Sequence, residues 1–287
     1  YKKLNKNKEQ LNQLFSSDIN SDFSYRELTA RYSNKKIALY YYATVVNGED
    51  IYKGIVRPLL ENTGNELKNI ITLSSVDDIT TFEDVVEPID RGKAVIFEEG
   101  NNTAYSVDVA QFQHRAIERS ENESVIKGPK EAFTESLNVN VSLLRGRFHD
   151  QHLINETMKI GARSKLEVNL VYVSDLVNDE ILSNVRERIK SIKADNIRNL
   201  GLLEQQIEER PYSIVPSILY TERPDKAASY IEDGYIVLLM DNSPACLVVP
   251  ITFWAFFHSP EDRYLRFLFG NFTRIIRFCA FFITIFI

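Results

Sequence analysis

The sequence predicts a mixed α/β protein of two similar α/β subdomains that arose by internal duplication, followed by an amphipathic helix and the start of a transmembrane helix. Three observations support this fold class. Two pairs of segments repeat in the same order along the chain, and its last part turns basic and then continuously apolar. The composition, with 44% hydrophobic and 26% charged residues, is typical of globular domains that bury a core.

The first repeated pair is Ala38–Ile51 and Val168–Ile181, which align without a gap. Each copy reads as a buried strand, a short turn and a helix with acidic residues in its first turn. Asn178 is a suitable N-cap for the second helix. Pro58 is expected to end or kink the first helix because it has no N–H to donate.

The second repeated pair is Arg91–Val109 and Asp233–Ile251. Both copies read as two strands joined by a polar turn, and a short helical pattern precedes each. Extra chain is expected in the second copy between about Ala194 and Pro216. Because both pairs occur in the same order, the sequence indicates one α/β unit present twice.

These patterns divide the chain into five parts. They are a polar, helical extension (residues 1–34), the first α/β subdomain (35–123), the second α/β subdomain (124–258), a basic amphipathic helix (259–277) and the truncated start of a transmembrane helix (278–287).

A helix is predicted to begin at Gly128-Pro129, because proline is tolerated in the first turn of a helix. Apolar residues then follow at helical spacing as far as Phe148, so this helix should bury one continuous face. Those residues are Phe133, Leu137, Val141, Leu144 and Phe148.

The segment around this helix is locally basic and supplies candidates for an anionic-ligand site or a subunit interface. These candidates are Lys130, Arg145, Arg147, Arg163 and Lys165. The alternative, which we favour, is that they are helix-end and hairpin charges paired with Glu131, Glu135 and Glu156.

Glu222 and Arg223 are further candidates, in the stretch "YTERPD". Proline followed by aspartate marks the start of a helix, so the simple interpretation is a structural cap. The alternative is that an exposed Glu-Arg pair docks a neighbouring subunit.

No motif for catalysis or nucleotide binding is present. The sequence has no glycine-rich phosphate loop, no HExxH and no GxSxG. His149 and His152 could share a metal, but no third ligand is evident and an exposed pair in a turn is the favoured interpretation. We therefore expect no enzyme activity, no cofactor and no metal. The net charge of −6, from 34 basic and 40 acidic residues, also argues against nucleic acid as a partner.

The end of the chain has the pattern of a membrane-surface helix. Four arginines fall on one helical face, away from most of the apolar residues: Arg263, Arg266, Arg274 and Arg277. The apolar run from Phe278 is shorter than the roughly twenty residues that a span needs, so we expect a transmembrane helix to continue beyond the sequence. A buried terminal helix is the alternative. Arginines ahead of a first span predict a cytoplasmic soluble part.

Several stretches closely resemble the A subunit of the GerA family of spore germination proteins. They are "IKGPKEAFTESLNVNVSLLRGR", "IGARSKLEVNLVYV" and the run from "ILYTERPDKAASYIEDG" to "FFHSPEDRY". The resemblance extends from about Lys35 to the end of the chain.

This resemblance implies a nutrient germinant receptor in the inner spore membrane, with this domain on the cytoplasmic, spore-core side of a multi-pass protein. It implies a transporter-like B subunit and a lipoprotein C subunit as partners, self-association in the membrane, and ion conduction. A small nutrient (an amino acid, a sugar or a nucleoside) would trigger germination. The family carries no catalytic residues to transfer.

Three hypotheses follow for this domain. The first, which we prefer, is a module for receptor assembly and signal relay. The second is a nutrient-binding domain that uses the cleft between the two subdomains, because ligand sites favour such crevices. The third, a hydrolase or transferase, ranks last because no nucleophile and base pattern is visible.

Overall fold

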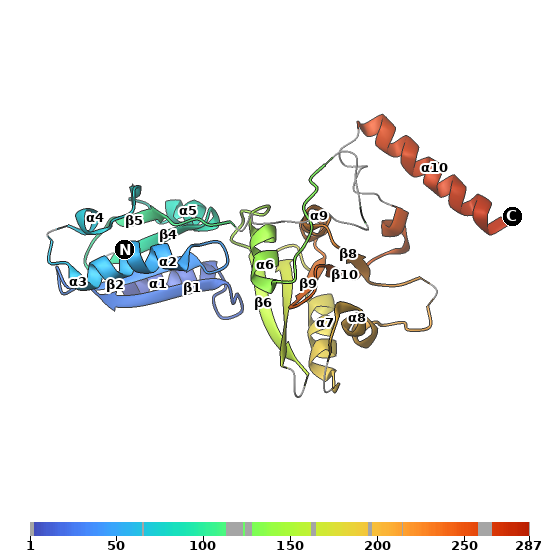
Figure 1. Ribbon diagram of the computed structural model, residues 1–287, viewed down its shortest axis with the longest axis horizontal. Helices are drawn as coiled ribbons and strands as arrows, with labels where there is room; N and C mark the ends of the chain where they lie inside the picture. Colours follow the sequence, from blue (N-terminus) through green and yellow to red (C-terminus); the bar gives the residue numbers. More distant parts are fainter. Residues whose placement is uncertain are drawn as a thin grey trace. The chain divides into compact units, whose positions relative to one another are not determined.

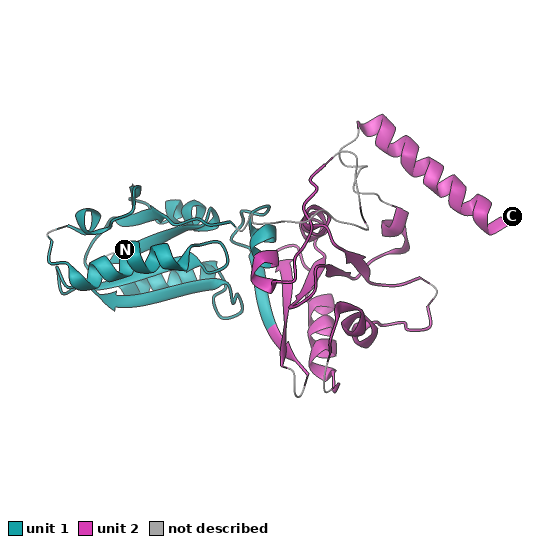
Figure 2. Cartoon of the chain, viewed as in Figure 1, with its two compact units in different colours: residues 1–114, 141–157 teal, residues 115–140, 158–287 magenta. Residues whose placement is uncertain are grey.

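The computed structural model shows two compact units (Figure 2). It describes residues 3–64, 66–112, 123, 128–161, 165–194, 197–213, 215–257 and 266–286. Unit 1 consists of Tyr1–His114 with Val141–Thr157, and unit 2 of Arg115–Asn140 with Met158–Ile287. Neither unit is therefore one continuous stretch of chain.

Each unit is built on a five-stranded antiparallel sheet (Figure 1). The strands of the first sheet are β1 (Phe23–Thr29), β2 (Lys36–Tyr42), β3 (Val76–Ile79), β4 (Lys93–Glu98) and β5 (Ala104–Asp108). Those of the second are β6 (Leu153–Ile160), β7 (Leu166–Val173), β8 (Leu219–Thr221), β9 (Ile236–Met240) and β10 (Cys246–Val249). The order β1-β2-β4-β5-β3 recurs strand for strand as β6-β7-β9-β10-β8. This shared topology confirms the predicted fold class.

The helices fall at matching places along the two copies. In the first part of the chain they are α1 (Leu4–Leu14), α2 (Gly48–Asp50), the π-helical η1 (Ile51–Val56), α3 (Arg57–Glu61), α4 (Leu67–Ile70), η2 (Glu83–Val85) and α5 (Val86–Asp90). In the second part they are α6 (Leu137–Arg145), α7 (Asp179–Ser191), α8 (Leu200–Ile207), α9 (Pro224–Glu232), η3 (Phe253–Phe257) and α10 (Phe267–Phe286). Helix α8 lies in the extra chain that the sequence predicted for the second copy.

At two pairs of aligned positions, the backbone has the same left-handed conformation in both copies of the repeat. Gly92 and Gly234, which the sequence aligns, follow α5 and α9 with φ of 79° and 84°. Gly100 and Asn242, also aligned, occupy the β4–β5 and β9–β10 turns with φ of 82° and 60°. A left-handed residue at the same two places in each copy is what a common ancestral unit would leave.

The sheet of unit 1 buries both of its faces, because its side chains alternate. Tyr40 and Tyr42 of β2 pack with buried residues of α1 and the α5 region. Ile37 and Leu39, on the opposite face, pack with those of η1, α3 and α4. Two apolar layers around one sheet explain why β2 reads as an almost continuous apolar run.

Pro58 distorts the first-copy helix without ending it, since helical residues continue to Glu61. Pro58 cannot donate to the carbonyl of Gly54 four residues earlier. That carbonyl instead accepts the backbone N–H of Thr72 at 3.1 Å. The chain winds as the π-helix η1 directly before the proline.

The prediction of a helix beginning at Gly128-Pro129 was wrong, because α6 starts at Leu137. The preceding residues use their backbone groups elsewhere: Phe133 N–H donates to the Glu222 carbonyl at 2.8 Å. Asn140 then fixes the start of α6, since its side-chain oxygen accepts the Thr134 N–H at 2.8 Å. Phe133 is buried either way, so apolar spacing could not distinguish the two conformations.

The chain ends in a single helix, α10, of 20 residues. The sequence divided this region into an amphipathic helix and a later transmembrane start at Phe278, whereas α10 begins at Phe267 and continues through both. It is long and apolar enough to cross a membrane, the one such helix in the described ranges, and only 6% of its apolar window is buried. An exposed apolar helix of this length has the dimensions of a bilayer span.

Candidate functional site

The end of α6 places Arg145 in a buried polar cluster of unit 1. Its Nε donates to Asp22 Oδ2 at 3.0 Å, and its guanidinium carbon lies 3.8 Å from the centre of the Tyr42 ring. The side chains of Arg145 and Asp22 are 2% and 0% exposed. The other oxygen of Asp22 accepts the Thr44 N–H at 2.9 Å, so both carboxylate oxygens are used. A charge pair this deeply buried is held only where such bonds compensate its lost hydration.

A second carboxylate, Asp90, lies in the same electrostatic environment at the end of α5. Burial raises the pKa of Asp90 to about 7, although the positive charge of Arg145 acts in the opposite direction. Burial also raises the pKa of Tyr42, which remains a neutral phenol. Burial opposes the charged form of Arg145, but nearby Tyr42 and Asp22 leave its pKa raised, so it stays a cation.

The residues around Asp22 also hold the first half of β6. Ser21 donates its backbone N–H and its hydroxyl to the Asn155 carbonyl, at 2.9 and 2.7 Å. Ser21 Oγ accepts the Thr157 N–H at 3.0 Å, and Asn20 Oδ1 accepts the Asn155 N–H at 3.3 Å. We call Asn20, Ser21 and Asp22 the unit 1 clasp. It attaches residues far along the chain to the start of β1.

Unit 2 has a comparable cluster at the start of α9, where Arg223 is the N-cap residue. Its Nη2 contacts Asp225 Oδ2 at 2.7 Å and donates to the Pro129 carbonyl at 3.0 Å. Its Nη1 donates to the Glu123 carbonyl at 3.2 Å. Arg223 thus fixes the chain that leads into α6.

Glu123 completes this cluster through its carboxylate. One oxygen pairs with Lys226 at 2.7 Å, and the other accepts the Glu222 N–H at 3.1 Å and the Thr221 hydroxyl. The "TERPD" stretch therefore caps α9 and binds an incoming segment at once. Both clusters consist of arginine, carboxylate and backbone groups, which provide anchoring and no nucleophile with a base.

The structure revises two of the predicted interface residues. Arg145 and Arg223 are each 1% exposed, so neither presents a docking surface; the charge that they carry is satisfied inside its own unit. Lys130 and Lys165 are exposed, and Arg147 and Glu222 are partly buried. Arg163 lies outside the described residues.

Sequence reasoning missed the partners of these arginines. Asp22 lies 123 positions before Arg145, and Glu123 lies 100 positions before Arg223. No local pattern marks Asp22, which reads as an ordinary polar residue before a strand. The one local signal is the position of Arg145 directly after two leucines at the end of a helix with an apolar face, which could have indicated a buried counter-ion.

The four predicted membrane-surface arginines have different surroundings. Arg266 is exposed, Arg274 and Arg277 are partly buried, and Arg263 lies outside the described residues. Arg277 donates to the Phe257 carbonyl of η3.

Aromatic side chains join η3 to α10. The rings of Trp254 and Phe278 stack with centroids 5.1 Å apart, and Phe257 lies 5.1 Å from both Phe278 and Phe281. These contacts fasten the base of α10 to the last turn of the folded part.

The two histidines considered for a metal have other partners. His149 Nδ1 lies 3.2 Å from the Asp90 carbonyl, and His152 Nδ1 lies 2.8 Å from Asp150 Oδ1. Within the described ranges, no group of three His, Cys, Asp or Glu side chains is placed to hold a metal ion.

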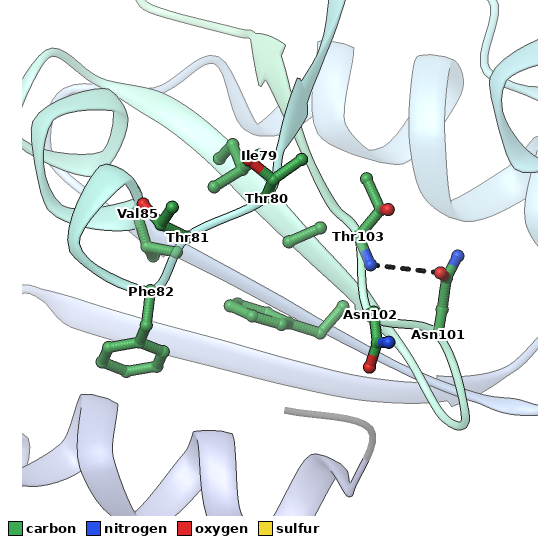
Figure 3. A pocket seen from close by; sticks show the side chains of 10 residues that line it. Ile79, Thr80, Thr81, Phe82, Val85, Asn101, Asn102 and Thr103 are labelled. Carbon is green, nitrogen blue, oxygen red and sulfur yellow. Dashed lines mark hydrogen bonds between the residues drawn. The ribbon is translucent and has the colours of Figure 1, made fainter.

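A small hollow opens in unit 1 where the chain leaves β3 toward α5 and passes the β4–β5 turn (Figure 3). Ile79 to Phe82 line one side, and Asn101 to Ala104 the other. Its volume of about 30 Å³ has room for a few waters and not for an amino acid or a sugar.

Comparison with known proteins identifies the family. The family described as "Bacillus/Clostridium GerA spore germination protein" matches residues 9–287. The uncharacterized membrane protein YfkQ of Bacillus subtilis is 34% identical over 86% of this chain and 50% of its own length. Spore germination protein GerLA of Bacillus cereus is 32% identical over 90% of this chain and 54% of its own. The chain thus spans about half the length of these relatives.

A solved structure shares the fold. The N-terminal domain of the A subunit of the Bacillus megaterium spore germinant receptor GerK3 superposes with a TM-score of 0.67, at 24% identity, over 88% of this chain and 96% of that domain. The match to the family extends over nearly the whole chain. The prediction that the protein is not an enzyme agrees with membership of this family. This chain belongs to the GerA family of spore germination proteins.

Proposed function

We propose that this chain is the N-terminal domain of a germinant receptor A subunit that acts in receptor assembly and relays the nutrient signal to the membrane. The main support for this proposal is that buried contacts anchor the segments of the chain that connect its sheets and its last helix. Arg145 and Arg223 hold them by buried bonds, and the η3 aromatics fasten α10 to the end of the folded part of unit 2. Such packing suits a part that transmits displacement rather than one that turns over a substrate.

The proposed partners are the transporter-like B subunit, the lipoprotein C subunit and further copies of this subunit in the membrane. These partners follow from the family resemblance, and the relative GerLA is named as a spore germination protein. Exposed Lys130 and Lys165 provide cationic contacts that remain available on the surface.

The proposed location is the inner spore membrane, in a multi-pass protein whose soluble part faces the spore core. Helix α10 has the length and apolar character of a span, and one relative is named as a membrane protein. Because the relatives are about twice as long as this chain, ion release would belong to a membrane part beyond α10.

Thermal unfolding of the chain in detergent, against amino acids, sugars and nucleosides at rising concentration, tests this proposal. We expect no change in the melting temperature at millimolar nutrient, because the relay hypothesis puts the nutrient site on a partner subunit. A ligand of the folded state present at a hundredfold excess over its Kd would add about 2.7 kcal/mol. A dose-dependent rise for one nutrient class would overturn the relay role in favour of nutrient binding by this domain.

The assembly role has a separate test. Lys130→Glu and Lys165→Glu should reduce the amount of B and C subunit that co-purifies with the receptor from spores. Lys190→Glu makes the same charge change on an exposed position of α7 and should leave co-purification unchanged. Equal recovery from all three variants would contradict an interface at Lys130 and Lys165.

A further inference from the structure

Helix α10 distributes its side chains about its axis in the reverse of the usual order. Gly270 is its buried residue, and Arg274 and Arg277 are partly buried. These three residues follow one another at intervals of four and three, so they share one face of the helix. The face that carries the arginines is therefore the less exposed one.

The opposite face of α10 is apolar and open. It carries Leu268, Phe272, Ile275 and Ile276, and each of these side chains is at least half exposed. A surface helix of a water-soluble domain buries its apolar residues and turns its charges outward. An exposed apolar face beside arginines is instead typical of a helix that lies at a membrane surface.

The contacts of η3 show where along α10 the rest of the chain lies. Trp254 stacks on Phe278, and Arg277 donates to the Phe257 carbonyl. Helices rise 1.5 Å per residue, so Phe278 lies about 16 Å beyond Phe267, the first residue of α10. If α10 stood along the bilayer normal with hydrocarbon from Phe267 onward, η3 would lie near the centre of a layer about 30 Å thick.

That depth does not suit the groups that it would bury. Arg274 and Arg277 would both lie in hydrocarbon, where a charged side chain is costly. Residues 250–252, which lead into η3, are neither helix nor strand. Irregular backbone is not tolerated in contact with lipid tails, because its polar groups find no partner there. The length of α10 alone would permit this upright position, but its contacts with η3 argue against it.

The chemistry of η3 and α10 fits the boundary of a membrane with acidic lipids. Trp254 and Phe256 are 56% and 41% exposed, and tryptophan favours the level of the lipid headgroups. Residues 253–257 and 266–286 contain three arginines and no acidic residue, whereas the whole chain has a net charge of −6. An anionic surface therefore attracts this end of the chain and repels the remainder.

We propose that η3 and α10 together bind an anionic lipid surface, with α10 oblique to the bilayer. Trp254 and the arginine face lie among the headgroups, and the apolar face from Leu268 to Ile276 lies against the acyl chains. The inference rests on the proposed membrane location. It adds the orientation of α10 and a lipid contact by η3.

Depth-dependent quenching of fluorescence tests this orientation, because Trp254 is the single tryptophan of the chain. The full chain is reconstituted in phosphatidylglycerol vesicles that contain a lipid with a nitroxide either on its headgroup or deep in its acyl chain. The headgroup nitroxide should quench Trp254 more strongly. In a Trp254→Phe background, Leu268→Trp should be quenched more strongly by the acyl-chain nitroxide. Tyr212→Trp in the same background, at a 100% exposed position, should be quenched by neither.

An upright span that begins at Phe267 gives the opposite order, with Trp254 deeper than a tryptophan at position 268, and this order would overturn the proposal. Flotation of the vesicles on a density gradient distinguishes the two possible failures. A chain that floats with reversed quenching, or with no quenching of Trp254, keeps its membrane location and contradicts the orientation. A chain that does not float contradicts both.

The lipid charge has its own test, in which the chain is diluted from detergent into vesicles and the lipid concentration at half-maximal quenching of Trp254 is measured. Arg266 is exposed, so Arg266→Gln should raise this concentration about fivefold for phosphatidylglycerol and leave it unchanged for phosphatidylcholine. Lys190→Gln removes an exposed charge from α7 and should change neither value. Equal values of the unmodified chain for the two lipids would refute an anionic partner.

Discussion

Two buried arginines, Arg145 and Arg223, hold distant segments of the chain in place. A guanidinium transferred from water into a protein interior loses several kcal/mol of hydration, which only closely placed partners return. Arg145 obtains them from Asp22 and Tyr42, and Arg223 from Asp225 and two carbonyls. Removing one partner leaves the other charge buried and unpaired.

Asp22→Asn is therefore expected to be strongly destabilising. It keeps the size of the side chain and an acceptor for Thr44 but leaves Arg145 without its counter-ion. We expect a loss of about 3–5 kcal/mol in the free energy of unfolding, measured by urea denaturation.

Asp77→Asn is the matched control, because Asp77 pairs with Lys93 at 3.1 Å while its side chain is 62% exposed. It should change stability little. The double variant Asp22→Asn/Arg145→Met should recover part of the loss, since the unpaired charge is gone. A similar small effect from both aspartate substitutions would show that the buried pair is not a stabilising unit.

Asp90 makes stability depend on pH. Its pKa is raised to about 7 in the folded protein from an ordinary value near 4, so the folded state binds the proton more tightly than the unfolded chain. Its contribution to stability is fully present below about pH 4 and is lost as pH rises to about 7. Asp90→Asn should abolish this part of the dependence and stabilise the protein at pH 8, by at most about 4 kcal/mol.

The measurement is urea unfolding at intervals from pH 4 to pH 8. Arg145, Asp150, His152 and Tyr42 also act on Asp90, so the difference between wild type and Asp90→Asn isolates the carboxylate. Parallel pH profiles for the two proteins would exclude Asp90 as the source.

At the scale of single elements, the residue found at a position in one copy predicts which substitution the equivalent position of the other copy tolerates. Gly234 has φ of 84°, and an added Cβ would lie 2.7 Å from the Leu176 carbonyl oxygen. Gly100 has φ of 82° with nothing within 4 Å of such a Cβ. Gly100→Ala should cost about 1–2 kcal/mol through backbone strain alone, and Gly234→Ala clearly more.

Gly100→Asn is the matched comparison, because Asn242 occupies the equivalent turn with φ of 60°. Asparagine tolerates this conformation, so we expect a smaller loss than for Gly100→Ala. Thermal unfolding of the three variants gives the order. If Gly234→Ala were as mild as Gly100→Asn, the close approach to Leu176 would not be a constraint.

The sequence was a good guide to elements whose signal is local and repeated. The ungapped match of Ala38–Ile51 with Val168–Ile181 predicted β2, β7 and the helices after them, and Asn178 is the N-cap as expected. It failed for residues 129–136, where the choice between helix and extended chain depends on bonds to Glu222 and Asn242 from distant parts of unit 2. The sequence did not predict the two buried clusters for the same reason, since Asp22 and Glu123 lie far along the chain from Arg145 and Arg223, which they contact.

At the scale of the whole molecule, η3 joins the folded part to the helix that is apolar enough to cross a membrane. Trp254 is the single tryptophan of the chain and stacks on Phe278. Phe278→Ala should therefore shift the Trp254 fluorescence emission, because it removes the ring that stacks on the indole. Phe286→Ala, at an 82% exposed position of α10, should leave the emission in place.

This comparison requires detergent micelles, which keep α10 in an apolar surrounding. Equal spectra for both variants and the unmodified chain would mean that η3 and α10 are not in contact in solution. In that case a displacement of the rest of unit 2 would have no packed route through η3 to α10.

The division of α6 and β6 between the two units has a consequence for folding during synthesis on the ribosome. Asp22 leaves the ribosome 123 residues before Arg145. At roughly 5–20 residues per second it spends about 6–25 s without its counter-ion. The first sheet can form during this interval, but the unit 1 clasp stays open until Thr157 has been made. The final step in folding unit 1 is thus tied to the synthesis of the first strand of the second sheet, and a nascent chain that stalls before this point carries a bare carboxylate in its interior.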